Sequence, residues 1–427
     1  MKPLSENLFA KAKDAGAYLD VAARPLRILG SVEWPDEVRG IFLKTGTLPD
    51  IKYEPIDTAP SLEAVREARK HIEGDHVVFE WLRRLAGDIE ETAHMIAARG
   101  TRAFHEHSKN LYGEPTRLML DKQTRVIDMA RHMDDALDGL DIPKLVVEGY
   151  EVQFTAKEFA NKLRPRLTHH FGKDAPKVLL VPQLSAKATA TSRRIRVRTS
   201  ATFSDRDVHQ LLQHEALVHS ATGLNGKAQT NFPILGRSHA GTTQIQEGLA
   251  VFAEIISGSM DPVRFRRLAD RVIAIHMSIE GADFKDVFDF YVARTDDADQ
   301  SYDNARRIFR GGLITGGAPF TKDMVYLNGL LRVHNYMRSV VKLGRADLIR
   351  VLFTGKMDLE DIPAIAQLAA SGRVDPPKFM PPWAKDLRFL VSYLAYSSFL
   401  NQVKMPGFQA YYKEELADVP VVWDFVE

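Results

Sequence analysis

The segment LLQHEALVHSATGLNG, residues 211–226, contains two histidines that could bind a metal ion. His214 and His219 are five residues apart, one more than in the H-E-x-x-H signature of zinc peptidases. Side chains five apart on a regular α-helix differ by about 140°, so they cannot face one ion. A single π-type turn absorbs the extra residue and brings the rings back toward one side. The spacing therefore predicts a metal-binding pair on a helix with a local π-type irregularity.

The segment HAGTTQIQEGLAVFAEIISG, residues 239–258, supplies two carboxylates in apolar surroundings. The pattern Thr243-x-x-Gln246 predicts a capping box, and the following residues are apolar nearly all round, so we expect a buried helix. Glu247 and Glu254 lie seven residues apart on one face of that helix. A buried carboxylate needs a metal, a proton or a cationic partner. Each glutamate is therefore either part of a metal site or the partner of a buried arginine.

Together, His214, His219 and Glu247 would supply two imidazoles and one carboxylate, which leaves a fourth zinc position open for water. Glu215 stands beside the first histidine, as the general base does in H-E-x-x-H enzymes. We therefore expect one Zn²⁺ per chain and hydrolysis of an amide by zinc-activated water, with Glu215 as base. Glu254 is expected behind the ligands, where it orients a histidine through the free ring N–H.

Two capping patterns and two strands are predicted around this site. Thr155-x-x-Glu158 and Ser204-x-x-Asp207 each predict the start of a helix, and the second helix leads into the histidines. KVLLVP, residues 177–182, predicts a buried strand. SRRIRVRTS, residues 192–200, alternates apolar and arginine residues, which favours an edge strand with one solvated face.

Composition bounds the classes of protein that the chain could belong to. The 427 residues include no cysteine, which excludes thiol nucleophiles, disulfides and zinc–thiolate sites. With 57 Lys+Arg and 56 Asp+Glu the net charge is +1, so we expect neither a nucleic acid nor a membrane surface as partner. Acidic residues interrupt the N-terminal segment, and no apolar run approaches the roughly 18 residues of a membrane span. A cytoplasmic protein is expected.

Periodic apolar residues divide the chain into two regions. Residues 61–140 have helical periodicity, and two short β-rich runs follow around residues 141–154. We place a domain boundary there, between a helical N-terminal region, residues 1–145, and a second domain, residues 146–427.

Several segments resemble one known family, the bacterial flavohemoglobin expression-modulating QEGLA motif proteins, which are homologous to the eukaryotic microtubule-associated tyrosine carboxypeptidases. The resemblance lies in HEALVH (214–219), TGLNGKAQ (222–229), TQIQEGLAVFAE (243–254), and YDNARRIFRGG and FTKDMVYLNGL between residues 302 and 330. It covers the second half of the chain and is looser before about residue 145. Leu217 stands where members often carry glycine, and the basic extension of a microtubule binder is missing. Action on tubulin therefore does not transfer.

The resemblance implies an α+β, mostly helical fold, with a zincin-like metallopeptidase domain of the gluzincin type over residues 146–427. It assigns the HExxxH histidines His214 and His219 and the QEGLA glutamate, Glu247, as zinc ligands, and Glu215 as catalytic base.

A carboxypeptidase needs a fixed cation for the terminal carboxylate of its substrate. Arg307 and Arg310 are three residues apart, which predicts a shared helix face just ahead of a glycine-rich loop. Lys322 follows in FTKDMVYLNGL, and Tyr326 could donate to the developing oxyanion. The alternative is an ion-pair network with a core tyrosine.

We therefore expect a zinc metallocarboxypeptidase that removes C-terminal residues, aromatic ones among them, from peptides or proteins. The alternatives are a regulatory or binding protein that keeps the metal scaffold without turnover, and an endopeptidase or aminopeptidase with the same zinc chemistry. The sequence does not predict an oligomeric state.

Overall fold

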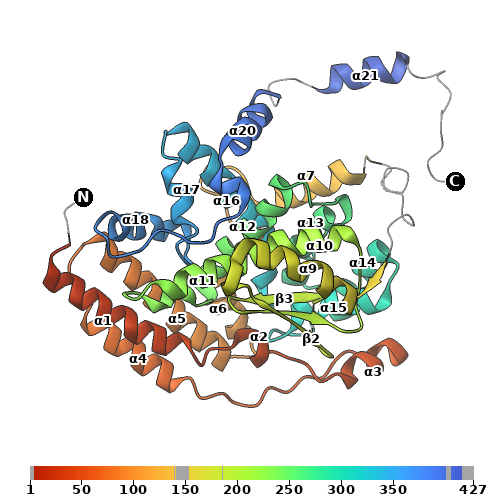
Figure 1. Ribbon diagram of the computed structural model, residues 1–427. Coiled ribbons are helices and arrows are strands. Elements are labelled where there is room, and N and C mark those ends of the chain that lie inside the picture. The colour runs from red at the N-terminus through yellow and green to blue at the C-terminus, as the bar shows by residue number, and fades with distance from the viewer. Residues whose placement is uncertain (1–3, 139, 141–152, 185, 401–404, 416–427) are drawn as a thin grey trace.

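The computed structural model describes residues 4–138, 140, 153–184, 186–400 and 405–415 (Figure 1). The chain is mostly helical with two small sheets, which confirms the predicted α+β class. The helices of the first region are α1 (Glu6–Ala23), α2 (Ile28–Ser31), α3 (Glu37–Thr45), α4 (Ala59–Lys70), α5 (Val77–Ala97), α6 (Arg102–Tyr112) and α7 (Val126–Asp138). None of the described helices is both long and apolar enough to cross a membrane.

The described part of the second region starts at residue 153 and contains both sheets and the remaining described helices. Its strands are β1 (Phe154–Thr155), β2 (Lys177–Val181), β3 (Ala188–Thr191), β4 (Arg194–Arg198) and β5 (Thr202–Phe203). Its helices are α9 (Ala156–Phe171), α10 (Asp205–Leu211), α11 (Ala221–Ala228), α12 (Ala240–Ile256), α13 (Pro262–Ile279), α14 (Phe284–Thr295), α15 (Ala298–Phe309), α16 (Met324–Lys342), α17 (Asp347–Val351), α18 (Ile362–Ala370), α19 (Pro382–Lys385), α20 (Arg388–Leu400) and α21 (Met405–Glu415). A π-helical segment, Leu212–Ser220, joins α10 to α11.

The larger sheet has the strand order β2-β4-β3, in which β4 pairs parallel with β2 and antiparallel with β3. The predicted alternation in β4 is confirmed, because Ile195 and Val197 are buried between exposed or half-buried arginines. The prediction of an edge position is wrong, since β4 has a partner on each side. The prediction of a buried β2 is also wrong: β2 is an edge strand, and Leu179 and Leu180 are exposed.

Two of the three predicted helix starts are confirmed. The side chains of Thr155 and Ser204 accept hydrogen bonds from the first turns of α9 and α10, and both capping boxes are present. The predicted box from Thr243 is wrong, because α12 begins at Ala240, one turn earlier. The QEGLA residues therefore lie in the second and third turns of α12, and almost all of that helix is buried, as expected.

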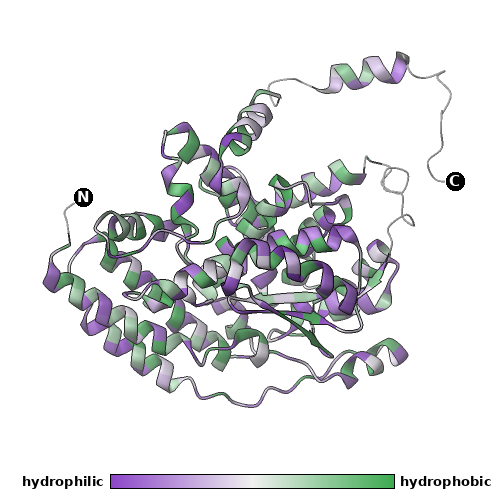
Figure 2. Cartoon of the chain, in the orientation of Figure 1, coloured by the Kyte–Doolittle hydropathy of each residue, from purple (hydrophilic) through white to green (hydrophobic). Residues whose placement is uncertain are grey.

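Residues from both predicted regions contribute to the largest hydrophobic cluster. Trp81 and Ile89 of α5 belong to the same cluster as Ile245 and Leu249 of α12. Helices α1 and α4 pack together and against α5, and hydrophilic and hydrophobic residues alternate along them, as expected of helices with one buried face (Figures 1 and 2). The proposed boundary near residue 145 lies outside the described residues.

A second hydrophobic cluster lies between α9, the sheets and the histidine helix, which is the continuous helix formed by α10, the π-helical segment and α11. Phe159 of α9 stacks on Phe203 of β5, with ring centroids 4.2 Å apart, and Leu217 of the π-helical segment belongs to the same cluster. This packing fixes the outer side of the histidine helix against the sheet. The inner side is left to face α12.

Candidate metal centre and cleft

The π-helical segment directs both histidines to one side of the chain. His214 and His219 have ring centroids 4.9 Å apart, which confirms the π-type irregularity predicted from their spacing. Two local hydroxyl groups also donate to carbonyls of this segment. The Ser220 hydroxyl donates to the carbonyl of Glu215 at 3.1 Å, and Thr222 donates to that of Val218 at 2.8 Å.

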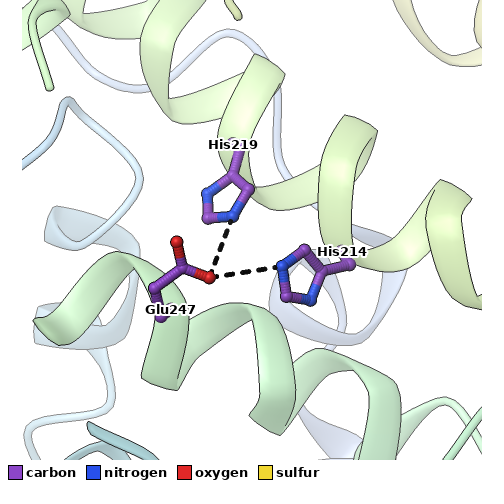
Figure 3. A group of neighbouring side chains, drawn as sticks. All are labelled: His214, His219 and Glu247. Carbon is purple, nitrogen blue, oxygen red and sulfur yellow. Dashed lines mark ion pairs between the residues drawn. The ribbon is translucent and has the colours of Figure 1, made fainter. Parts of the chain in front are cut away.

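Glu247 approaches the two rings from α12 (Figure 3). Its Oε2 lies 3.4 Å from His214 Nε2 and 3.7 Å from His219 Nε2. In a tetrahedral site with zinc–ligand distances of about 2.0–2.1 Å, neighbouring ligand atoms are roughly 3.4 Å apart. The spacing and the types of these three donors therefore fit a zinc ion.

Glu254 lies one layer behind the histidines and is fully buried. Its Oε1 is 2.6 Å from His214 Nδ1, and Arg264 donates to both of its oxygens at 2.8 and 2.9 Å. Burial raises the pKa of Glu254, but Arg264 and His214 outweigh that effect and hold the pKa well below its usual range. Glu254 thus pairs with an arginine, which was one of its two predicted alternatives, and the same carboxylate also contacts the His214 ring.

The carboxylates around His214 stabilise a positive charge at this position. Burial lowers the pKa of His214, but hydrogen bonds to Glu247 and Glu254 raise it to about 10. The same field would favour a divalent cation bound to the imidazoles. With Nδ1 facing Glu254, Nε2 is the nitrogen left to face the metal position.

The glutamine and glycine of QEGLA hold α12 against its neighbours. Gln246 Oε1 accepts a hydrogen bond from Thr222 Oγ1 at 2.9 Å, which ties α12 to the histidine helix. Gly248 crosses α16 at Gly329 so closely that a Cβ at residue 248 would lie 2.1 Å from the Gly329 carbonyl carbon. Gln246 was predicted only as part of a capping box, and neither Gly248 nor Gly329 was given a role, although two glycines inside apolar helical segments indicate a close helix crossing.

Two side chains of the TGLNGKAQ segment, residues 222–229, hydrogen-bond α11 and the residue after it to later parts of the chain; we call these contacts the clamp on α11. Asn225 donates to the carbonyls of Phe353 and Phe379, each at 2.7 Å, and accepts from the Phe379 N–H at 3.0 Å. Gln229 makes a similar pair of hydrogen bonds with the backbone of Asp375. These bonds position the histidine helix and do not reach the metal-ligating atoms.

A cavity of about 380 Å³ opens onto the three potential metal ligands, His214, His219 and Glu247. It is lined by every residue predicted for catalysis, metal binding or substrate binding except Glu254: His214, Glu215, His219, Glu247, Arg307, Arg310, Lys322 and Tyr326. Further lining residues were not predicted from the sequence: Ser238 and Thr243, the β3 residues from Ala188 to Ala190, and an apolar wall. That wall consists of Ala23, Leu26, Ile28, Leu29 and Ile89.

The cations in the cleft differ in whether they already have a partner. Arg307 donates from Nε and Nη2 to the Asp323 carboxylate at 2.6 and 2.8 Å. Arg310 is only 6% exposed, and among the described residues no carboxylate pairs with it; the same holds for Lys322, which is 8% exposed. Burial and the neighbouring Arg307 lower the pKa of Arg310 to about 10. The predicted shared helix face is wrong, because α15 ends at Phe309 and Arg310 has an extended backbone.

Residues 42–402 match the model of the MATCAP family, which is described as microtubule-associated tyrosine carboxypeptidase. The match covers most of the chain. The chain belongs to the MATCAP family. This confirms the resemblance seen in the HEALVH and QEGLA segments. A comparison with curated proteins found no match.

The MATCAP match begins at residue 42, so part of the cleft lies outside it. Ala23, Leu26, Ile28 and Leu29 belong to the end of α1 and the segment that follows, and they line one wall of the cavity. Ile28 packs against the cluster that contains Tyr112 and Phe320. The N-terminal helices therefore complete the cleft that the MATCAP-matched region begins.

Proposed function

We propose that the protein is a zinc carboxypeptidase that hydrolyses the last peptide bond of peptides or proteins. The observation that carries this proposal is that two buried cations, Arg310 and Lys322, lie in the same cleft as His214, His219 and Glu247 and pair with no carboxylate in the described part of the chain. Membership of a family described as tyrosine carboxypeptidase supports it. We extend the proposal to the zincin-like, gluzincin-type architecture.

His214, His219 and Glu247 would hold the zinc ion, as their donor types and spacing indicate. When bound, zinc supplies a Lewis acid and lowers the pKa of water at its open coordination position. Glu254 keeps His214 in the tautomer that presents Nε2, since its carboxylate accepts from Nδ1–H.

Glu215 lines the cleft beside the first ligand and acts as general base in this proposal. It accepts a proton from the attacking water and delivers that proton to the leaving amino group. Tyr326 donates its hydroxyl to the carbonyl oxygen as negative charge develops there. The Tyr326 ring lies 4.2 Å from the Arg271 guanidinium, and its hydroxyl is 3.4 Å from Arg307 Nη2, so nearby cations favour that role.

The substrate carboxylate would bind Arg310, with Lys322 beside it. A guanidinium matches a carboxylate in charge and geometry. Arg307 is less suited to this task, because Asp323 already occupies its Nε and Nη2. Its proposed role is to hold Asp323 and the Tyr326 hydroxyl.

The peptide chain would lie along β3. This strand pairs with β4 on one side only, and Ala188, Thr189 and Ala190 line the cleft. A free strand edge offers main-chain hydrogen bonds to an extended peptide. The apolar wall of Leu26, Ile28 and Leu29 would accommodate an apolar side chain, aromatic ones included.

The proposal is tested by comparing the hydrolysis of a peptide that has a free C-terminal carboxylate with that of the same peptide carrying a C-terminal amide. The free acid should be hydrolysed much faster, and Arg310→Ala should remove most of that preference by slowing the acid substrate. Arg306→Ala is the matched control, because Arg306 is a nearby arginine that pairs with Asp303 and does not line the cleft. Equal hydrolysis of both peptides, or an unchanged preference in Arg310→Ala, would refute carboxylate anchoring.

A further inference from the structure

Ser238 and Lys356 form a hydrogen-bonded pair at the cleft that no step above uses. Lys356 Nζ lies 2.6 Å from Ser238 Oγ. Ser238 is exposed and lines the cleft with Glu215 and His219, whereas Lys356 is only 7% exposed. The lysine therefore reaches the serine from inside the protein.

The backbone around Lys356 is fixed by close packing. Its N–H donates to the carbonyl of Leu235 at 2.7 Å, and a Cβ at the preceding Gly355 would lie 2.7 Å from the Leu235 Cβ. The lysine side chain passes Gly223 of α11, where an added Cβ would lie 3.5 Å from its Cε. The segment before Ser238 thus fixes the backbone of Lys356, and the lysine side chain runs past α11 to reach Ser238.

The donor and acceptor roles within the pair follow from the chemistry of its two groups. An ammonium can only donate, so Ser238 Oγ is the acceptor in the contact with Lys356. The serine still has its own O–H, and that hydrogen must point away from the ammonium. No other hydrogen bond of the Ser238 side chain is found among the described residues, and no carboxylate there pairs with Lys356. The hydroxyl is thus left as a polarised donor at the cleft surface.

We propose that Ser238 is a substrate-binding residue whose hydroxyl donates to a main-chain carbonyl of the bound peptide, and that Lys356 is the positioning residue that fixes the direction of this hydroxyl. The inference rests on the proposed function, which supplies a peptide to the cleft. The terminal carboxylate is assigned to Arg310 and Lys322 on other elements. A carbonyl of the peptide main chain is the acceptor that remains.

Peptide binding to the Glu215→Gln protein tests this inference without turnover. Ser238→Ala in that background should weaken binding roughly 3- to 10-fold, the effect of one lost hydrogen bond. Lys356→Met should have a similar effect. The double variant should be hardly weaker than either single one, because both substitutions remove the same interaction.

A series of peptides with one thioamide at successive positions identifies the acceptor. Sulfur is a weaker acceptor than oxygen, so the effect of Ser238→Ala should vanish for the peptide whose thioamide replaces the contacted carbonyl. This contrast also decides the matter if Lys356→Met proves too unstable to measure. Ser339→Ala and Lys342→Met, on α16 and outside the cleft, are matched controls and should bind normally.

The outcomes separate this inference from the proposed function. If the unsubstituted chain hydrolyses and binds peptides but Ser238→Ala binds them equally well, the inference is wrong and the proposed function stands. Additive effects of the two substitutions would equally overturn the positioning role of Lys356. If the cleft binds no peptide at all, both are overturned.

Discussion

At the scale of single residues, Glu254 links the proposed metal site to the helix behind it. Its carboxylate contacts His214 on α10's continuation and Arg264 on α13 at once. Glu254→Gln keeps the shape but weakens both contacts, so zinc affinity should fall roughly 10- to 100-fold. Competition with a chromophoric chelator measures this. Glu280→Gln, an exposed site at the end of α13, should leave affinity unchanged.

The three ligand side chains should bind one zinc ion per chain. His219→Ala and Glu247→Ala each remove a donor that lies within 4.8 Å of the other ligand atoms. Elemental analysis of the purified variants should then show strong loss of zinc relative to the unsubstituted protein. Full zinc content in both variants would refute the assignment.

Glu215 should be separable from metal binding. Glu215→Gln preserves the size of the side chain but cannot take a proton from water. We expect normal zinc content with hydrolysis reduced at least about 100-fold, as for the loss of a general base. Hydrolysis at the rate of the unsubstituted protein would mean that another group acts as base.

At the scale of elements, the metal site depends on how α12 lies between α16 and the histidine helix. The Gly248 and Gly329 backbones are in contact, and no side chain fits between them. Gly248→Ala should therefore push α12 away from α16, destabilise the protein by about 1–3 kcal/mol or more, and lower zinc affinity by displacing Glu247. Thermal unfolding and chelator competition measure the two effects.

A matched glycine in an exposed helix isolates this effect from helix propensity. Gly40 of α3 has no atom within 4 Å of an added Cβ. Gly40→Ala should leave zinc affinity unchanged and stability equal or slightly higher, because alanine favours a helix. If Gly248→Ala behaves in the same way, the helix crossing does not set the ligand geometry.

The elements of the site were predictable where a short-range rule applied. The five-residue spacing of His214 and His219 indicated a π-type turn, and the seven-residue spacing of Glu247 and Glu254 indicated one helix face. Strand positions were not predictable in this way, because β4 owes its central place to pairing with β2 and β3. Arg264 was also missed, since its contact with Glu254 depends on how two helices cross.

At the scale of the whole molecule, a cluster of three acidic residues, Asp88, Asp358 and Asp361, makes the free energy of unfolding depend on pH. Burial, together with Asp361 and Asp358, raises the pKa of Asp88 to about 7. The folded chain thus holds this proton more tightly than the unfolded chain, whose Asp pKa is near 3.8. The stabilising contribution is full below about pH 4 and is lost as pH rises through about 7.

Asp88→Asn should accordingly make the melting temperature depend less on pH in this range. We expect the melting temperature of the unsubstituted protein to fall between about pH 5 and pH 8, and the variant to lose less over the same interval. Calorimetry across that range measures the difference. Asp14→Asn, at an exposed site on α1, should keep the slope of the unsubstituted protein. An identical slope in Asp88→Asn would contradict the argument.

The cleft as a whole could be predicted only in part. Arg310, Lys322 and Tyr326 were expected near the ligands from the resemblance, and they do line the same cavity. The difference between Arg307, which pairs with Asp323, and Arg310, for which the described residues include no carboxylate partner, was not predictable, because α15 ends between the two arginines. The part of the apolar wall that comes from the first 30 residues carries no motif.

The clamp on α11 has a consequence for the order in which the protein matures. Asn225 binds carbonyls that lie 128 and 154 residues later in the chain. A ribosome therefore releases both histidines and Glu247 long before it releases the segments that lock their helix in place. A nascent chain would carry every metal ligand while its cleft is still unfinished. The proposed hydrolytic activity would thus arise only after Phe379 has left the ribosome and Asn225 has bound its backbone.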